Sequence, residues 1–172
     1  MRRIAVAVLA AGAVVAVVAG CGGAGAGPFA WPSDAGTTTI GSPVRSGQTF
    51  AMTIVLPRTS TTPAVLLDVN PLHPEDARAL TLRYGATTGL GLELARTRGW
   101  SSRKYQVRPL AGFVIPAHVV GGVTIGAASK RRGVHKIRGF VVDYRIGDRR
   151  YSATMQMNFA LCVGMRQCPS RL

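Results

Sequence analysis

The clearest pattern in the sequence is an alternation of apolar and polar positions near its C-terminal end. Apolar residues occupy every second position from 140 to 146, and Gly147-Asp148 follows them. Apolar residues then occupy alternate positions from 151 to 161. A period of two is typical of half-buried strands, and a two-residue turn of this kind is favoured in hairpins. The pattern predicts an antiparallel hairpin with one buried and one hydrated face.

Shorter apolar runs with the same character precede the hairpin. Residues 72–77, with two prolines and two acids, predict a loop or a single helical turn. Gly121-Gly122 predicts a bulge or bend in the apolar run over residues 118–125. The runs cover residues 49–56, 64–69, 79–84, 89–95, 105–107, 113–115 and 118–125.

About eight short strands separated by turn signals predict an all-β fold over residues 47–172. The expected architecture is an immunoglobulin-like antiparallel β-sandwich. A small β-barrel is the alternative.

The N-terminus has the order of a targeting segment. Arg2 and Arg3 precede an apolar run over residues 4–19, which is shorter than the roughly 20 residues that a spanning helix needs. Residues 1–20 are therefore predicted to be a signal peptide. An uncleaved anchor is an alternative, and it also places the following domain outside the cytoplasm.

The residues Val18-Ala19-Gly20-Cys21 resemble the bacterial lipobox. This resemblance implies that Cys21 carries a lipid on its sulfur and is the first mature residue. It also implies a lipid-anchored location on the extracytoplasmic face of the cell membrane. An ordinary secretory signal cut nearby is the other interpretation.

Residues 21–46 are rich in Gly, Ala, Pro, Ser and Thr. Such a composition buries too little apolar surface to fold, so we expect a flexible tether. Phe29 and Trp31 either contact the membrane or pack on the domain, and the sequence leaves both open.

The cysteine count agrees with the lipid anchor. There are three cysteines, and if Cys21 is lipidated, Cys162 and Cys168 remain as a pair. In an oxidising compartment this pair predicts a disulfide that closes a short loop. A metal or redox site is the weaker interpretation, because the spacing is not that of a CxxC motif.

The charge is strongly positive. The chain has 21 Lys and Arg against 7 Asp and Glu, a net charge of +14. Residues 1–20 contain two arginines and no acid, so their removal leaves +12. This charge favours an anionic partner, although the arginine content is also typical of a GC-rich genome.

The densest positive stretch predicts a contact with anionic head groups or wall polymers. A solvated loop is the alternative interpretation. Besides the bilayer that holds the lipid, the expected partner is an anionic envelope polymer or another envelope protein. Nucleic acid is not expected, because no aromatic residues interleave with the basic ones. The stretch comprises Lys130, Arg131, Arg132, Lys136 and Arg138.

The sequence contains no HExxH, GxSxG or phosphate-loop motif, and we predict no catalytic residue, metal or cofactor. The expected role is a non-enzymatic binding or structural module of the cell envelope. A copper or small-ligand carrier is the alternative, and a hydrolase is less favoured. The copper hypothesis rests on Met155 and Met157, which are first expected in the core, with His73, His118 or His135.

Residues 133–151, with the strand that follows, resemble the C-terminal hairpin of actinobacterial lipoproteins and membrane-anchored proteins. The chemistry of these proteins is not known. The resemblance therefore implies lineage and architecture, and it assigns no functional residue.

Overall fold

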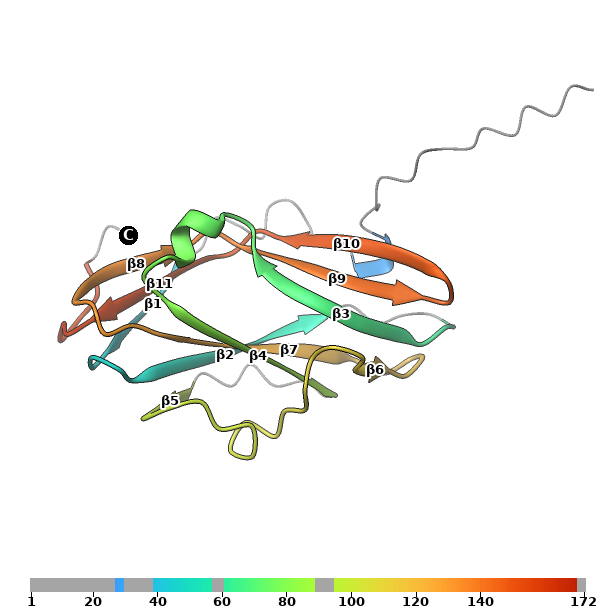
Figure 1. Cartoon of the computed structure of the whole chain (residues 1–172), viewed down its shortest axis with the longest axis horizontal. Helices are drawn as coiled ribbons and strands as arrows, with labels where there is room; N and C mark the ends of the chain where they lie inside the picture. The colour runs from blue at the N-terminus through green and yellow to red at the C-terminus, as the bar shows by residue number, and fades with distance from the viewer. Residues whose placement is uncertain (1–26, 30–38, 57–60, 89–94, 170–172) are drawn as a thin grey trace, which may run out of the picture.

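The computed structural model describes residues 27–29, 39–56, 61–88 and 95–169, which form an all-β sandwich (Figure 1). The predicted immunoglobulin-like sandwich is confirmed, and none of the described sheets closes into a barrel. In these ranges two short 3-10 turns, η1 (Gly27–Phe29) and η3 (Pro74–Ala77), accompany the strands. The strands are β1 (Thr39–Val44), β2 (Thr49–Leu56), β3 (Ala64–Pro71), β4 (Thr81–Thr88), β5 (Ala95–Thr97), β6 (Val114–Ile115), β7 (Gly121–Ala128), β8 (Gly133–Ile137), β9 (Phe140–Ile146), β10 (Arg149–Met155) and β11 (Asn158–Val163).

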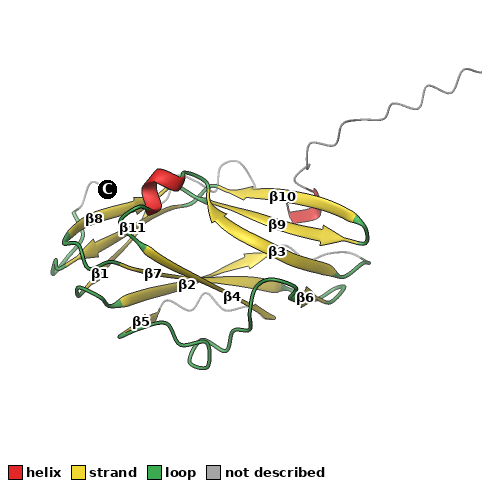
Figure 2. Ribbon diagram, in the orientation of Figure 1, coloured by secondary structure: helices red, strands yellow, loops and turns green. Residues whose placement is uncertain are grey.

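The strands form two layers (Figure 2). One layer contains the sheet β4-β7-β2-β5. The other contains two sheets, β1-β11-β8 and β10-β9-β3-β6. Strands β8 and β9 follow one another along this layer, so the loop before β8 and the hairpin after β9 lie at opposite ends of the sandwich (Figure 1). Most pairings are antiparallel, but β1 pairs with β11 in parallel.

Alternate residues of the strands fill the space between the layers. Phe50 of β2 stacks on Phe159 of β11, with ring centroids 5.0 Å apart. Phe140 and Tyr144 of β9 are fully buried in the same cluster. The period of two in the sequence therefore identifies the inward face of these strands correctly.

The outer face of β2 and β7 is covered by the segment after β5. Trp100 and Tyr105 pack there, with ring centroids 5.2 Å apart. The glycines of the sheet leave room for the indole, because a Cβ on Gly126 would lie 2.5 Å from Trp100 Cε3. This covering explains why nearly every residue of β2 is buried, including those that the alternation assigns to a hydrated face.

Two predictions in this region are wrong. Residues 105–107 do not form a strand; the segment makes one bridge, between Arg108 and Ala86, because its apolar side chains cap the sheet from outside. Gly121-Gly122 makes no bulge, and both glycines stay in register with β2. At Gly121 a Cβ would lie 2.5 Å from Ile115 Cδ1, so the glycine permits close packing.

The predicted C-terminal hairpin is confirmed at its turn, where Ile146 pairs with Arg149. The alternating run over residues 151–161 is, however, two strands. Its first part, β10, pairs with β9, and its second part, β11, pairs with β1 and β8. The chain changes sheets near Met157 without changing which face is buried, so the sequence pattern does not reveal the break.

The predicted boundary at residue 47 is too late, because β1 already forms part of the sandwich at Thr39. Phe29 also packs on the domain: its side chain is fully buried and its ring lies 4.3 Å from that of Tyr144. Its backbone N–H donates to Tyr144 Oη at 3.1 Å. Trp31 lies outside the described residues. A helix of sufficient length and apolarity to cross a membrane does not occur in the described part of the chain.

Replacing Phe29 tests whether this segment belongs to the fold. We expect Phe29→Ala to lower the free energy of unfolding by about 3 kcal/mol, because it leaves a cavity beside Tyr144. Urea denaturation measures the change. Val114→Ala is the control, since Val114 is 51% exposed and should change stability little. Equal stability of the Phe29 variant and the wild type would contradict the docking of η1.

Candidate anion-binding site

Three turns meet at one end of the sandwich, opposite to the β9–β10 hairpin (Figure 1). They are the β1–β2 turn (residues 45–48), the β7–β8 loop (129–132) and the loop after β11 (164–168). Hydrogen bonds hold them together. Gly47 N–H donates to the Ser129 carbonyl at 2.9 Å, and Gly164 N–H donates to the Val44 carbonyl at 2.8 Å. Ser46 Oγ donates to the Lys130 carbonyl at 3.1 Å.

These turns, with strand β5 beside them, gather six cations that we call the basic end. None of the acids in the described ranges belongs to these turns or to β5; those acids are Asp68, Glu75, Asp76, Asp143 and Asp148. The salt bridges found between described residues also leave the six cations unpaired. The basic end comprises Arg45, Arg96, Lys130, Arg131, Arg132 and Arg166.

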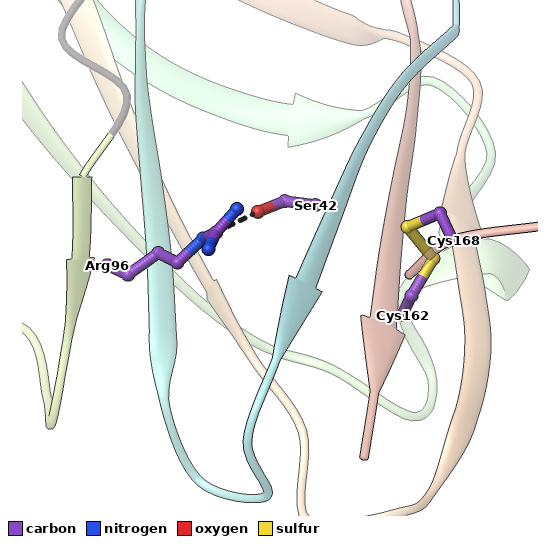
Figure 3. Close-up of a disulfide and its surroundings, with 4 residues drawn as sticks. All are labelled: Ser42, Arg96, Cys162 and Cys168. Carbon is purple, nitrogen blue, oxygen red and sulfur yellow. Dashed lines mark hydrogen bonds between the residues drawn. A yellow bond between two sulfur atoms is a disulfide. The ribbon is translucent and has the colours of Figure 1, made fainter. Parts of the chain in front are cut away.

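The predicted disulfide between Cys162 and Cys168 is confirmed, with Cα atoms 5.5 Å apart (Figure 3). Cys162 is buried in β11, beside Pro43 of β1 in the register. The bond holds the loop that carries Arg166 back against this strand. The position of Arg166 is therefore restrained by a covalent link as well as by the bond from Gly164.

Arg96 reaches from β5 across to β1 (Figure 3). Its Nε donates to Ser42 Oγ at 3.2 Å, and Ser42 is almost fully buried. This bond orients the guanidinium and uses one of its five N–H groups. Its other N–H groups have no hydrogen-bond partner among the residues that the structure describes.

A pocket of about 540 Å³ lies between the β1–β2 turn, β5 and the disulfide loop. A second hollow of about 380 Å³ adjoins it along β1, and Arg96 lines both. The described residues that line the larger pocket include three arginines and no acid. Its residues are Pro43, Val44, Arg45, Gln48, Arg96, Gly164, Met165 and Arg166.

The structure brings together only part of the basic stretch predicted from the sequence. Lys130, Arg131 and Arg132 lie exposed at the basic end, and the side chain of Arg132 extends along Gly164. Lys136 is exposed farther along β8. Arg138 follows β8 at its far end and contacts η3 instead.

Arg138 is held by two acids. Its Nε donates to Asp76 Oδ2 at 2.8 Å, and its Nη2 donates to Asp76 Oδ1 and to Glu75 Oε1, each at 2.9 Å. The hydrogen bonds from Arg138 lower the pKa of Asp76, although partial burial of this carboxyl opposes the shift. Arg138 therefore fastens η3 to the sheet and is less available to an anionic surface than the other predicted residues.

The three histidines lie in different surroundings. His73 Nδ1 lies 3.4 Å from Glu75 Oε1, and His135 Nε2 lies 2.9 Å from the Arg131 carbonyl. His118 lies in a turn with a φ of 63°. Met155 is buried in the core, as expected. In the described ranges, no group of three or more His, Cys, Asp or Glu side chains is placed to hold a metal ion.

Sequence reasoning missed Arg45, Arg96 and Arg166. Arg45 falls in the expected tether, and Arg96 directly follows the predicted strand over residues 89–95. Only for Arg166 did the sequence give an indication of its position, since it lies in the loop between the two paired cysteines. These three arginines are brought together by strand pairing, which their spacing in the sequence does not show.

Comparison with known proteins gives no family. No protein-family model matches the chain, and no curated protein matches it. The VesB protease of Vibrio cholerae aligns with 72% of this chain and 30% of its own, at 7% identity and a TM-score of 0.35. A family 123 glycoside hydrolase from Clostridium perfringens aligns with 77% of this chain and 24% of its own, at 12% identity and a TM-score of 0.38. The chain spans less than a third of either protein, and at these values neither likeness bears on its function.

The Arg138 contact predicts a stability that depends on pH. The lowered pKa of Asp76 stabilises the fold above the ordinary value of 3.8, and this contribution is lost as the pH falls below it. We therefore expect Arg138→Gln to melt at a lower temperature than the wild type at neutral pH, with a difference that shrinks toward about pH 2.5. Thermal denaturation followed by circular dichroism measures this. Arg150→Gln, on the exposed edge strand β10, is the control, and a difference that stays constant with pH would contradict the assignment.

Proposed function

We propose that this chain is an exported lipoprotein, anchored through Cys21, whose sandwich is a non-enzymatic binding module for an anionic polymer of the cell envelope. The basic end is the contact surface. The observation that supports this most is the gathering of six cations on three adjoining turns and β5, with no acid among them. The targeting segment and the lipobox resemblance support the export and the anchor.

The position of η1 favours an envelope polymer, rather than the anchoring bilayer, as the partner of the basic end. Cys21 lies six residues before Gly27, a link that reaches about 20 Å at most. Phe29 docks beside Tyr144 and Tyr151, close to the β9–β10 hairpin. From there to the basic end, β8 and β9 extend over about 35 Å. A short link at one end favours an orientation in which the opposite end points away from the membrane.

The copper or small-ligand carrier is the alternative to this proposal. It gains no ligand cluster from the described residues, in which Met155 is buried and the histidines lie apart. A hydrolase is likewise not favoured, because no nucleophile lies beside both a histidine and an acid among the described residues. The basic end is the feature that favours an anion-binding module.

The anchor can be tested directly. We expect cells that express the chain to incorporate radiolabelled fatty acid into it, and Cys21→Ser to abolish the label, because the cysteine sulfur carries the lipid. Cys162→Ser combined with Cys168→Ser is the control and should keep the label. Label that persists in Cys21→Ser would overturn the anchor.

The contact surface is tested with immobilised poly(glycerol phosphate) and the full chain in non-ionic detergent. Replacing Lys130, Arg131 and Arg132 by Gln should weaken binding at least about tenfold and reduce its salt dependence, since exposed cations act through screened charge. The matched control replaces Arg108, Arg149 and Arg150, which are exposed elsewhere, by Gln. Equal losses in the two triple variants would show a response to net charge alone and would contradict the proposed surface.

A further inference from the structure

The pocket at the basic end differs from the exposed loop beside it, because one of its guanidinium groups and one of its loops are held in place. Arg96 is tied to the buried Ser42, and Arg166 lies on a loop closed by the disulfide. The Oε1 of Gln48 accepts a hydrogen bond from the backbone N–H of Arg45 at 2.9 Å, and the side-chain N–H groups of Gln48 have no partner among the described residues. Donors that are fixed before a ligand arrives lose less entropy on binding.

The arrangement of donors suits a tetrahedral anion. Arg45, Arg96 and Arg166 come from three different segments, the β1–β2 turn, β5 and the C-terminal loop. A planar carboxylate has two oxygens, which one arginine fork can satisfy. A phosphate group has oxygens directed to several sides, so it can accept from arginines that approach from separate segments.

The remaining lining indicates what the phosphate is attached to. Pro43, Val44 and Met165 supply apolar surface beside the arginines. The pocket of about 540 Å³ is within the range of sites that hold small organic ligands. A small carbon skeleton next to the phosphate would therefore contact these three residues.

We propose that the pocket lined by Arg45, Gln48, Arg96 and Arg166 is a binding site for a phosphate ester of a small polyol, the repeating unit of a phosphate-bearing envelope polymer. The site deepens the proposed function and rests on it for the origin of the ligand. The exposed cations Lys130, Arg131 and Arg132 attract the polymer, and the pocket binds one of its phosphate groups.

Calorimetric titration of the full chain in non-ionic detergent with glycerol 3-phosphate tests the pocket, at physiological salt. We expect saturable binding of one ligand per chain. Arg96→Gln and Arg166→Gln should each weaken it about tenfold or more, because each removes charge-assisted hydrogen bonds. Arg150→Gln is the matched control and should bind like the wild type. Melting curves establish that each variant is folded, and Arg45→Gln replaces any variant that is not.

Competition experiments distinguish the possible sources of the ligand. Poly(glycerol phosphate) should compete with glycerol 3-phosphate, whereas polyglutamate and phosphatidylglycerol vesicles should not. Competition by polyglutamate, or binding of the vesicles alone, would overturn the assignment of a polymer phosphate. Failure to bind glycerol 3-phosphate, or binding unchanged in Arg96→Gln and Arg166→Gln, would overturn the pocket. If the polymer then still bound through Lys130, Arg131 and Arg132, the proposed function would stand without this site.

Discussion

The parallel pairing of β1 with β11 determines where the basic end forms. Six residues of β1, Thr39–Val44, pair in order with Asn158–Val163. Because the two strands run in the same direction, the segments that follow them emerge together, and Gly164 N–H bonds the Val44 carbonyl. Arg45 and Arg166, which are 121 positions apart in the sequence, therefore line one pocket. An antiparallel pairing would have placed these turns at opposite ends of the sandwich.

Gathering cations at one end has an energetic cost, because like charges in a small region repel one another. At physiological salt the Debye length is about 8 Å, so neighbouring turns still interact. Elsewhere in the protein, acidic side chains neutralise a cation: Arg138 pairs with Asp76 and Glu75, and these ion pairs also fasten η3. The described residues offer no such partner at the basic end. An anionic ligand bound there would relieve the repulsion that the fold leaves in place.

The sequence predicts which residues of a strand face the core better than it predicts which strands pair with one another. Alternation identifies Phe50 and Phe140 as inward-facing, and it needs no knowledge of the partner strand. Strand β1 escapes detection because its sequence, Thr-Ile-Gly-Ser-Pro-Val, has the composition of a linker and becomes a strand by pairing with β11. The switch from β10 to β11 is hidden because the period of two continues through it. Contacts such as Arg138 with Asp76 span 62 positions, and no local pattern encodes them.

The same distinction applies to the candidate site. A run such as Lys130-Arg131-Arg132 is visible in the sequence, but its exposed side chains recognise little beyond charge, since long mobile cations act mainly through screened attraction. Selectivity requires donors held in fixed directions, and these come from residues that the run does not include. The guanidinium of Arg96 is oriented by a serine on another sheet, and the loop that carries Arg166 is closed by a disulfide. In the proposed site, attraction and selection would thus arise from different residues at one end of the molecule. A chain of repeated phosphates can engage both at once, with one group in the pocket and its neighbours along the loop.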